Sequence, residues 1–360
     1  MIFAMHDPLA DLLGEWSRGL NTGSVLLRIA LAVLLASVIG CERSSKRHSA
    51  GLRTFVLVSF ASTVSMLLDV YLMSNFGARL PILSAATVIA AALRPWEGVI
   101  AADTGHINVH ETGAIEGSGH KVLVAEGREG KVSAEGVRAV CACHTDEHMV
   151  HPRLLYISQP TEIGTVYSLA ELRALRAVCD EQGLILFVDG ARLGSALTSE
   201  GCDVTLSDLA ALADCFYIGG TKNGLLFGEA MVIVNPALQK DFRFMIKNRG
   251  GMMAKGRLCG LMFLTALEHD DYFAWARHAN EMADIVRGAM RRAGISSFQQ
   301  TATNQLFPIV AKDQRSKLEE RVAFERWGDL PDGRCVIRFV TSWATQREEA
   351  EALADILEAL

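Results

Sequence analysis

The chain has 360 residues, half of them hydrophobic, which is enough for two or three domains with a sizeable core. Its formal net charge of -6 argues against a nucleic-acid partner, because such a partner requires a basic face. The eight cysteines are scattered, so free thiols in a reducing compartment are expected rather than a disulfide framework. The first residues include acids and no basic cluster, so a typical signal peptide is not expected.

The first part of the chain carries two apolar runs, over residues 26–40 and 55–72, on either side of a short basic loop. Each uncharged run has roughly 13 or 14 residues, fewer than the ~20 needed to cross a bilayer. Arg28 and Asp69 lie near the outer ends and could extend each span by reaching the interface. By length alone, a buried helical hairpin in a soluble protein is an alternative to a membrane hairpin.

The loop between these runs carries a specific pattern, Ile-Gly-x-Glu-Arg at residues 39–43 and Ala-Gly-Leu-Arg-Thr at residues 50–54. The pattern resembles the first two spans of the MgtC/SapB membrane family. It divides the start of the chain into an N-terminal segment, 1–23, and a truncated hydrophobic hairpin, 24–75, through which the resemblance implies contact with an inner membrane. Because basic loops stay cytoplasmic, both ends of such a hairpin would lie outside, on the wrong side for a domain with free thiols.

Beyond residue 81 the pattern changes to short apolar runs that alternate with helical stretches. The runs lie at 99–103, 121–125, 154–158, 184–189, 215–219 and 230–235. Helices are expected at about 82–93, 168–183 and 255–293, and a late strand is expected at 336–342. Continuous apolar strands alternating with helices predict an α/β fold with a mostly parallel sheet covered on both faces.

Polar groups follow directly after three of these strands, in the segments 103–111, 187–192 and 217–224. Ligands bind at the carboxyl ends of strands in such sheets. Asp189 after one strand and Lys222 after another suit pyridoxal 5'-phosphate (PLP), since a lysine amine carries this cofactor and a carboxylate keeps its ring nitrogen protonated. Glycines on both sides of Lys222 permit a close approach of the backbone.

Several further motifs occur in a fixed order from residue 82 to the C-terminus. They are HINVHETGAIE, EHMVHPRLLYISQPTEIGTVYS, FVDGARLGSAL, YIGGTKNGLLFGEAMVIVN, NRGGMMAKGRLCG, TNQLFPI and RFVTSW. Together they resemble the threonine aldolase and β-eliminating lyase family of fold-type I PLP enzymes. The resemblance implies a PLP-binding large domain at 82–252 and a small C-terminal α/β domain at 253–360.

The resemblance also implies roles for individual residues. Lys222 matches the cofactor lysine and Asp189 the partner of the ring nitrogen, with Thr221 beside them at the cofactor. Arg192 matches a residue near the cofactor oxygen and the substrate carboxylate, and Arg338 matches the small-domain arginine that grips the α-carboxylate. Both fit chemically, because a guanidinium binds a carboxylate through two parallel hydrogen bonds.

Further positions complete the implied site. His106 matches a histidine that stacks on the pyridine face, with Glu111 in the same loop near the substrate. His148 matches a histidine near the substrate hydroxyl, so the base for the β-hydroxyl is expected to be His148 or His106. Arg249 matches, over a looser alignment, a residue that reaches the cofactor phosphate of a neighbouring subunit.

One departure from the family is marked. The family has an early Gly-Thr turn that opens a helix whose amides hold the cofactor phosphate. Here the chain reads NFGARLPILSAATVIAAALRPWEG, so the helix is kept but the turn and everything before it are replaced by the hydrophobic hairpin. The sequence thus resembles a join of two unrelated halves, as a gene rearrangement or an assembly artefact would produce.

The inferred activity is cleavage of a β-hydroxy-α-amino acid such as threonine into glycine and an aldehyde. A β-eliminating lyase or aminotransferase on the same fold, and a non-catalytic MgtC-like fragment, are the alternatives. The resemblance implies a cytoplasmic enzyme body and a homo-oligomer, either a dimer or a tetramer with shared active sites. A zinc site at Cys141, Cys143, His144, His148 and His151 is a weaker rival, because two cysteines only two residues apart are poorly spaced for a structural site.

Overall fold

The computed structural model describes residues 22–46, 56, 85–252 and 256–360. The chain divides into two units, one with residues 81–314 and 324–360, the other with residues 1–80 and 315–323. Most of the expected N-terminal segment, 1–23, and almost all of the second apolar run, 55–72, lie outside the described residues.

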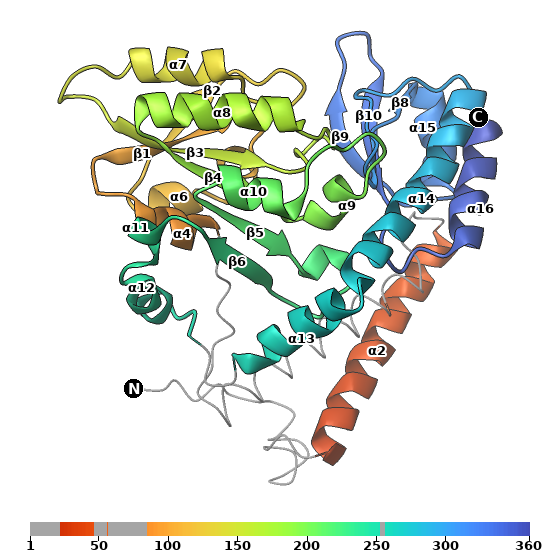
Figure 1. Ribbon diagram of the computed structural model, residues 1–360. Coiled ribbons are helices and arrows are strands. Elements are labelled where there is room, and N and C mark those ends of the chain that lie inside the picture. The colour runs from red at the N-terminus through yellow and green to blue at the C-terminus, as the bar shows by residue number, and fades with distance from the viewer. Residues whose placement is uncertain (1–21, 47–55, 57–84, 253–255) are drawn as a thin grey trace. The chain divides into compact units, whose positions relative to one another are not determined.

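The larger unit is built on a six-stranded sheet with the strand order β2-β1-β3-β4-β5-β6 (Figure 1). Neighbouring strands run parallel except β6, which is antiparallel to β5. The strands are β1 (Glu97–Ala102), β2 (Val122–Ala125), β3 (His151–Ser158), β4 (Ile185–Asp189), β5 (Cys215–Gly219) and β6 (Glu229–Ile233). This mostly parallel sheet, built from the strands that the sequence predicts, confirms the expected fold class.

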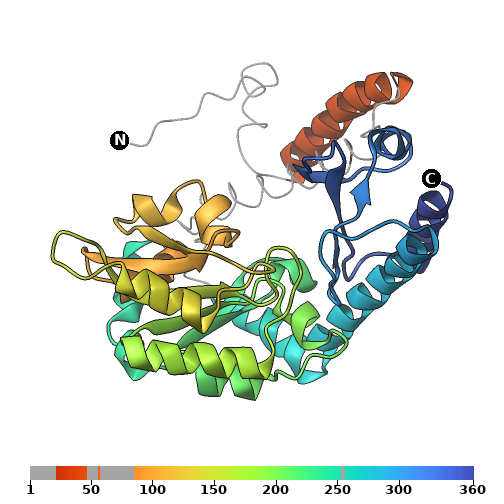
Figure 2. The same ribbon diagram turned by 90° about the horizontal axis from the view of Figure 1, so that it is seen from above.

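Helices cover both faces of the sheet, and Figure 2 shows the two layers from above. One face is covered by α7 (Ala134–Ala142), α8 (Leu169–Gln182) and α10 (Leu206–Leu212), the other by α4 (Ala85–Ala92), α5 (His106–Val109) and α6 (Ala114–Gly117). Every residue of β1, β4 and β5 is buried. Such fully buried strands explain why the sequence shows continuous apolar runs rather than alternation.

Local signals fix the ends of the best-defined helix, α8. The side chain of Ser168 accepts a hydrogen bond from the amide of Glu171, and the Glu171 carboxylate bonds back to Ser168, which forms a capping box. Gly183 ends the helix in the left-handed region, with φ of 65°. The helix therefore begins and ends within a residue of its expected bounds, 168–183.

A smaller antiparallel sheet follows, in the order β7-β10-β8, with β9 also paired to β10. Its strands are β7 (Gln305–Leu306), β8 (Ile309–Val310), β9 (Glu325–Asp329) and β10 (Cys335–Val340). The helices of the C-terminal part are α13 (Arg257–Glu268), α14 (Asp271–Arg292), α15 (Lys312–Glu319) and α16 (Arg347–Glu358). The helical segment expected at 255–293 forms two helices, since Asp270 adopts a left-handed φ of 62° between α13 and α14.

Short elements connect the sheets to the site. They are α9 (Leu193–Leu197), η2 (Thr221–Asn223), α11 (Pro236–Gln239) and α12 (Phe242–Asn248). The hydroxyl of Ser195 in α9 donates to Oδ1 of Asn280 in α14, at 2.6 Å, and both side chains are buried. This contact ties the long helix of the C-terminal part to the segment that follows β4.

In the other unit, α2 (Thr22–Ser45) contains the first apolar run. The sequence predicts a loop from residue 41, but the helix continues to Ser45, and Lys46 pairs with Glu42 one turn earlier. Of the described residues, Gly23–Glu42 form a stretch of 20 residues that is long and apolar enough to cross a membrane. Length and composition alone support this, and the stretch reaches 20 residues because it includes the charged residues Arg28 and Glu42.

Candidate active site

A cavity of about 290 Å³ opens at the carboxyl ends of β3, β4 and β5. The side chains that line it come from segments far apart in the sequence. They are Ala85, His106, Glu111, Ser158, Pro160, Thr161, Glu162, Asp189, Ala191, Arg192, Tyr217, Lys222 and Glu229. Five residues that the sequence predicts for the site, namely His106, Glu111, Asp189, Arg192 and Lys222, thus meet in one place.

Asp189 ends β4 as a buried carboxylate. Its Oδ2 accepts hydrogen bonds from the hydroxyls of Tyr156 and Tyr217, and its Oδ1 accepts one from the amide of Ala191 at 2.9 Å. Burial and the nearby carboxylate raise the pKa of both tyrosines, so they remain protonated donors. The carboxylate is therefore held in one orientation by three donors.

Lys222 lies in the turn after β5, within η2. Much of its side chain is open to solvent, yet the surrounding protein removes enough water to lower the pKa of its amine. Burial is the main cause, and the nearby Arg192 cation acts in the same direction. A lysine with a lowered pKa holds more of its amine neutral at neutral pH, which is the form that reacts with a carbonyl.

The two strand-end turns that carry Asp189 and Lys222 approach each other closely. A Cβ on Gly190 would collide with the carbonyl oxygen of Tyr217, and one on Gly219 would collide with that of Ala191. The amide of Gly219 donates to the carbonyl of Gly190 at 2.9 Å. Glycine is therefore required at both positions for the two turns to share one cavity.

Arg192 and Arg338 carry the positive charge near the cavity. Burial and the repulsion of Arg338 lower the pKa of Arg192 to about 10. Arg338, on β10, is paired with Glu325 and lies 4.9 Å from the ring centroid of Trp327. Arg338 does not line the cavity. Its positive charge lowers the pKa of both Arg192 and Lys222, so it lies near these two residues.

His106 begins α5, directly after β1. Its Nδ1 lies 2.7 Å from Oε1 of Glu111, and this hydrogen bond raises the pKa of the imidazole. The Glu111 carboxylate thus favours the charged form of His106 and fixes which ring nitrogen faces the loop.

Two carboxylates of the cavity, Glu162 and Glu229, were not predicted. Glu162 follows β3, and its Oε1 accepts hydrogen bonds from the hydroxyl of Ser158 at 2.6 Å and from the amide of His106 at 2.9 Å. Glu229 begins β6; its Oε2 accepts the amide of Gly220 at 2.7 Å, and its carboxylate also bonds the side chain of Thr221. Burial raises the pKa of Glu162 and raises that of Glu229 to about 7.

Two residues expected at the site lie elsewhere in this structure. His148 is exposed and precedes β3, whose carboxyl end lines the cavity. Eight residues at roughly 3.3 Å each place the two ends of β3 about 25 Å apart, so His148 does not reach the cavity of its own chain. Arg249 is exposed at the end of α12 and does not line the cavity either.

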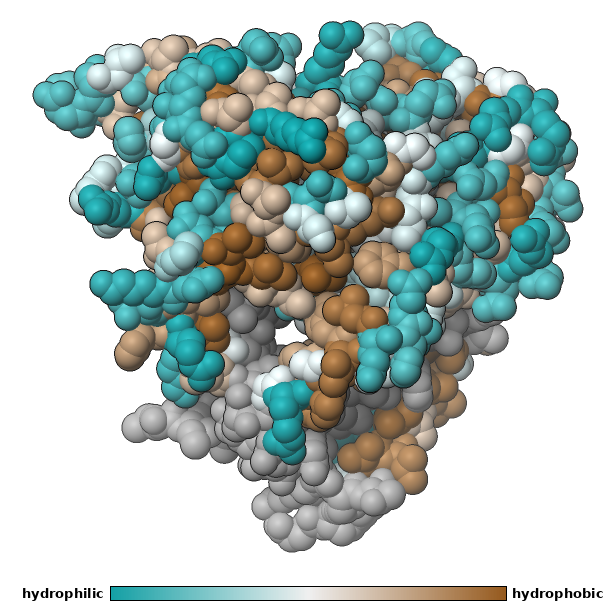
Figure 3. Space-filling model, in the orientation of Figure 1, coloured by the Kyte–Doolittle hydropathy of each residue, from teal (hydrophilic) through white to brown (hydrophobic). Residues whose placement is uncertain are grey.

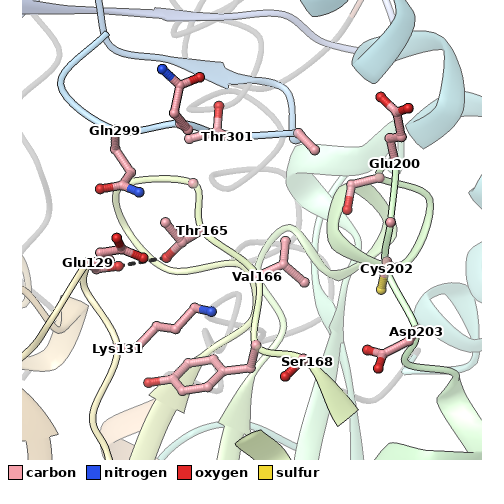
Figure 4. A pocket seen from close by; sticks show the side chains of 16 residues that line it. Glu129, Lys131, Thr165, Val166, Ser168, Glu200, Cys202, Asp203, Gln299 and Thr301 are labelled. Atoms are coloured by element: carbon pink, nitrogen blue, oxygen red, sulfur yellow. Dashed lines mark hydrogen bonds between the residues drawn. The ribbon is translucent and has the colours of Figure 1, made fainter. Parts of the chain in front are cut away.

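A larger cavity, of about 470 Å³, lies on the other side of the turn 161–165 (Figure 4). Its lining is polar and includes Glu129, Glu200 and Asp203, and the hydroxyl of Thr165 donates to the carbonyl of Glu129 at 2.8 Å. None of the catalytic or binding residues that the sequence predicts lines it. Size therefore does not select between the two cavities, and the site residues that the sequence predicts gather in the smaller one.

The geometry agrees with the matches to known proteins. Residues 83–313 match the family described as beta-eliminating lyase. The chain belongs to this family. It is 32% identical over 269 residues to a low specificity L-threonine aldolase of Pseudomonas aeruginosa, covering 74% of this chain and 77% of that protein. A low specificity L-threonine aldolase of Escherichia coli is 26% identical over 210 residues, which cover 58% of this chain and 60% of that protein.

Solved structures give the same family. A threonine aldolase of Leishmania major superposes with a TM-score of 0.75 and 44% identity, covering 76% of this chain and 80% of that one. A methionine aminotransferase of Escherichia coli shares the fold, with a TM-score of 0.59 and 16% identity over 81% of this chain and 82% of that one. This chain is thus a homologue of threonine aldolases on a fold-type I scaffold, as its sequence predicts.

The MgtC family matches residues 29–115, as expected for the start of the chain. This match overlaps the beta-eliminating lyase match between residues 83 and 115. In the structure, residues 85–115 form α4, β1 and α5 and enter α6, all packed on the large sheet. The overlapping segment therefore folds with the lyase part. Of the described residues, no group of three His, Cys, Asp or Glu side chains is placed to hold a metal ion.

Proposed function

We propose that this chain is a PLP-dependent aldolase that cleaves a threonine-like β-hydroxy-α-amino acid into glycine and an aldehyde. The observation that carries the proposal is the convergence of Lys222, Asp189, Arg192 and His106 on one cavity. Membership of the family and the likeness to low specificity L-threonine aldolases support it.

The residues of the cavity fit PLP. Asp189 offers a buried, oriented carboxylate for the ring nitrogen, and Lys222 offers an amine with a lowered pKa. Ala85, the first residue of α4, lines the cavity, so the beginning of this helix is where a phosphate would be held. When bound, PLP supplies an electron sink for the pair released from a bond to Cα.

The remaining groups bind and orient the substrate. Arg192 in the cavity and Arg338 beside it are the cations for the α-carboxylate. His106, held by Glu111, provides the ring that stacks against the cofactor. Thr221 provides a hydroxyl for the cofactor when its hydrogen bond to Glu229 is replaced by one to the cofactor. The β-hydroxyl proton must pass to a base within the same cavity.

A homo-oligomer is part of the proposal. Apolar side chains stand exposed on α13, and Figure 3 shows hydrophobic residues gathered along this helix. Leu258, Leu261 and Leu264 are spaced three residues apart and are 45%, 51% and 58% exposed. A stripe of this kind on a helix surface is typical of a protein interface. With a partner bound nearby, the exposed Arg249 would reach the phosphate held by the other subunit.

The proposed cellular location of the protein rests on two parts of the chain. We propose a cytoplasmic enzyme body, because PLP chemistry and eight scattered cysteines suit a reducing compartment. Membrane contact is proposed through residues 24–75, since α2 contains the 20-residue apolar stretch. Partition of the purified chain between detergent-free buffer and vesicles measures this part of the proposal separately.

The test of function is spectroscopic and chemical. Purified protein with added PLP should show the absorbance band of the lysine-bound cofactor, and threonine should yield glycine and acetaldehyde. An amino acid with a β-leaving group separates the alternative of β-elimination, which would release pyruvate and ammonia. Absence of the band with PLP in excess would identify the lyase part as a non-catalytic domain joined to an MgtC-like fragment.

A further inference from the structure

Glu162 has no role in the proposal so far, although it lines the reactive cavity. It follows the carboxyl end of β3 and is held from two sides, by the hydroxyl of Ser158 and by the amide of His106. Both bonds go to Oε1. Neither of these bonds uses Oε2, so this oxygen can face a ligand in the cavity.

Geometry places Glu162 on the substrate side of the cavity. Its charge acts on Arg192, which is the cation for the substrate carboxylate, and it is bonded to the residue that carries the stacking imidazole. Glu229, by contrast, lies on the side of the cavity that carries Lys222 and is hydrogen-bonded to Gly220 and Thr221. The titratable groups that act on or respond to Glu162 are Asp189, Arg192, Tyr156 and Tyr167, and His106 contacts it through its backbone amide.

The other candidate bases fit less well. His148 does not line the cavity. His106 does, but its hydrogen bond to Glu111 raises the pKa of its imidazole, so the ring tends to carry a proton already. Burial raises the pKa of Glu162, which makes it a stronger base than an exposed glutamate, while the hydrogen bonds from the Ser158 hydroxyl and the His106 amide act in the opposite direction.

We propose that Glu162 is the catalytic residue that takes the β-hydroxyl proton when the Cα–Cβ bond breaks, an inference that rests on the proposed aldolase function. The proton passes from the hydroxyl oxygen to Oε2 of Glu162. The O–H electron pair forms the carbonyl bond of the aldehyde. The Cα–Cβ pair stays with Cα, which then takes up a proton to become glycine, so no oxidant or further reactant is needed.

The experiment compares E162Q, E162D and the wild-type chain, each with PLP in excess. Three readouts are measured: PLP affinity by quenching of tryptophan fluorescence, exchange of the α-proton of glycine in D2O, and threonine cleavage. Glycine exchange needs the cofactor and lysine but has no hydroxyl to deprotonate. E129Q, altered in the neighbouring cavity on the other side of the turn 161–165, is the matched control.

E162Q should lose threonine cleavage by at least about a hundredfold, the usual contribution of a general base. PLP affinity and glycine exchange should stay close to those of the wild-type chain, E162D should recover part of the cleavage, and E129Q should behave as wild type. The wild-type pH profile should also show an acid limb that E162Q lacks.

Two results would overturn the inference alone. One is threonine cleavage by E162Q at more than about a tenth of the wild-type rate, since a general base contributes more than that. The other is an equal loss of cleavage, glycine exchange and PLP affinity, which would show that Glu162 only supports the structure. A wild-type chain that exchanges glycine but does not cleave threonine would instead overturn the proposed function and this inference with it.

Discussion

Glu229 and Lys222 both line the cavity, and burial shifts the pKa of each toward neutral pH against their mutual attraction. Burial raises the pKa of Glu229 to about 7, while burial and Arg192 lower the pKa of Lys222. The pKa values of the acid and the amine therefore move toward each other. Groups tuned in this way can exchange a proton near neutral pH, which is the property expected of an active site rather than of a structural ion pair.

The first prediction concerns the stability effect of Glu229. It keeps its proton in the folded chain up to about pH 7, whereas its ordinary pKa is 4.5. Between these values the folded state binds more protons than the unfolded state, so stability falls as pH rises through this window. E229Q, which still accepts the Gly220 amide, should therefore be more stable than wild type at neutral pH by up to about 3 kcal/mol.

Urea denaturation at pH 7 and below pH 4.5 measures this difference. The gain should vanish at the lower pH, where both states are protonated. E116Q, at an exposed position on α6, is the control and should show no pH-dependent gain. An equal gain from E229Q at both pH values would mean that packing, not protonation, causes it.

The second prediction concerns the attachment of PLP to Lys222. Borohydride reduction of the protein with excess PLP, followed by peptide mapping, should place the cofactor on Lys222. The reason is that this lysine alone combines a lowered pKa with a place in the cavity, among the described residues. An adduct mainly on Lys247, an exposed lysine of α12, would contradict the assignment. K222R, which keeps the charge and removes the reactive amine, should give no adduct at the site.

The residues found from the sequence and those missed differ for a physical reason. Asp189, Arg192, Lys222 and His106 follow apolar strands directly, and the carboxyl ends of parallel strands meet at one edge. Tyr156 and Tyr217 lie inside strands, where an aromatic residue is expected in a core, so no local signal marks them as partners of a carboxylate. His148 was expected from the family resemblance alone, and its place before β3 leaves it outside the cavity of its own chain.

At the scale of elements, β6 explains why Glu229 was overlooked. Because β6 is antiparallel, its first residue pairs with the last residue of β5, Gly219 opposite Glu229. The beginning of this strand therefore lies at the same edge as the carboxyl ends of the others. A search restricted to residues that follow strands therefore misses Glu229. The strand itself is predictable from its apolar run, but its direction is set by pairing, which the sequence does not display.

The exposed stripe on α13 gives the third prediction. L261E introduces a charge in the middle of the leucine stripe and should weaken self-association, because an interface core excludes unpaired charge. The dissociation constant, measured by sedimentation velocity over a dilution series, should rise at least about tenfold, equivalent to about 1.4 kcal/mol. V124E, on the exposed side of β2, is the control for adding a surface glutamate. If both variants associate as wild type does, α13 is not the interface.

At the scale of the whole molecule, two sequences of different character share one chain. The lyase part keeps its sheet, its small antiparallel sheet and its reactive cavity. The MgtC-like part contributes α2, an apolar helix that the chemistry does not use. Fold class and domain order could be read from the sequence because each half carries its own motifs. The relation between the halves could not, since no motif spans them.

The last prediction follows from the segment in which the halves join. The family's Gly-Thr turn is replaced here by NFGARLPILSAAT, so the helix α4 lacks the turn that precedes it in the family. Hydrogen bonds to a charged phosphate are roughly twice as strong as neutral ones, and each helix-start contact with an anion adds about 0.3–1 kcal/mol. Losing several such contacts should weaken PLP binding by about 3 kcal/mol, or roughly a hundredfold.

A chimera tests this directly, with residues 1–81 replaced by the corresponding start of the Pseudomonas aeruginosa threonine aldolase. The repaired chain should bind PLP about a hundredfold more tightly and cleave threonine faster, because the phosphate anchors the cofactor whose ring and amine partners, Asp189 and Lys222, are already in place. K222R in the chimera controls for cofactor held without the lysine. If the original chain already binds PLP as tightly and cleaves threonine as fast as the chimera, then the substituted segment supplies the phosphate contacts itself, and the replaced turn has no bearing on the activity.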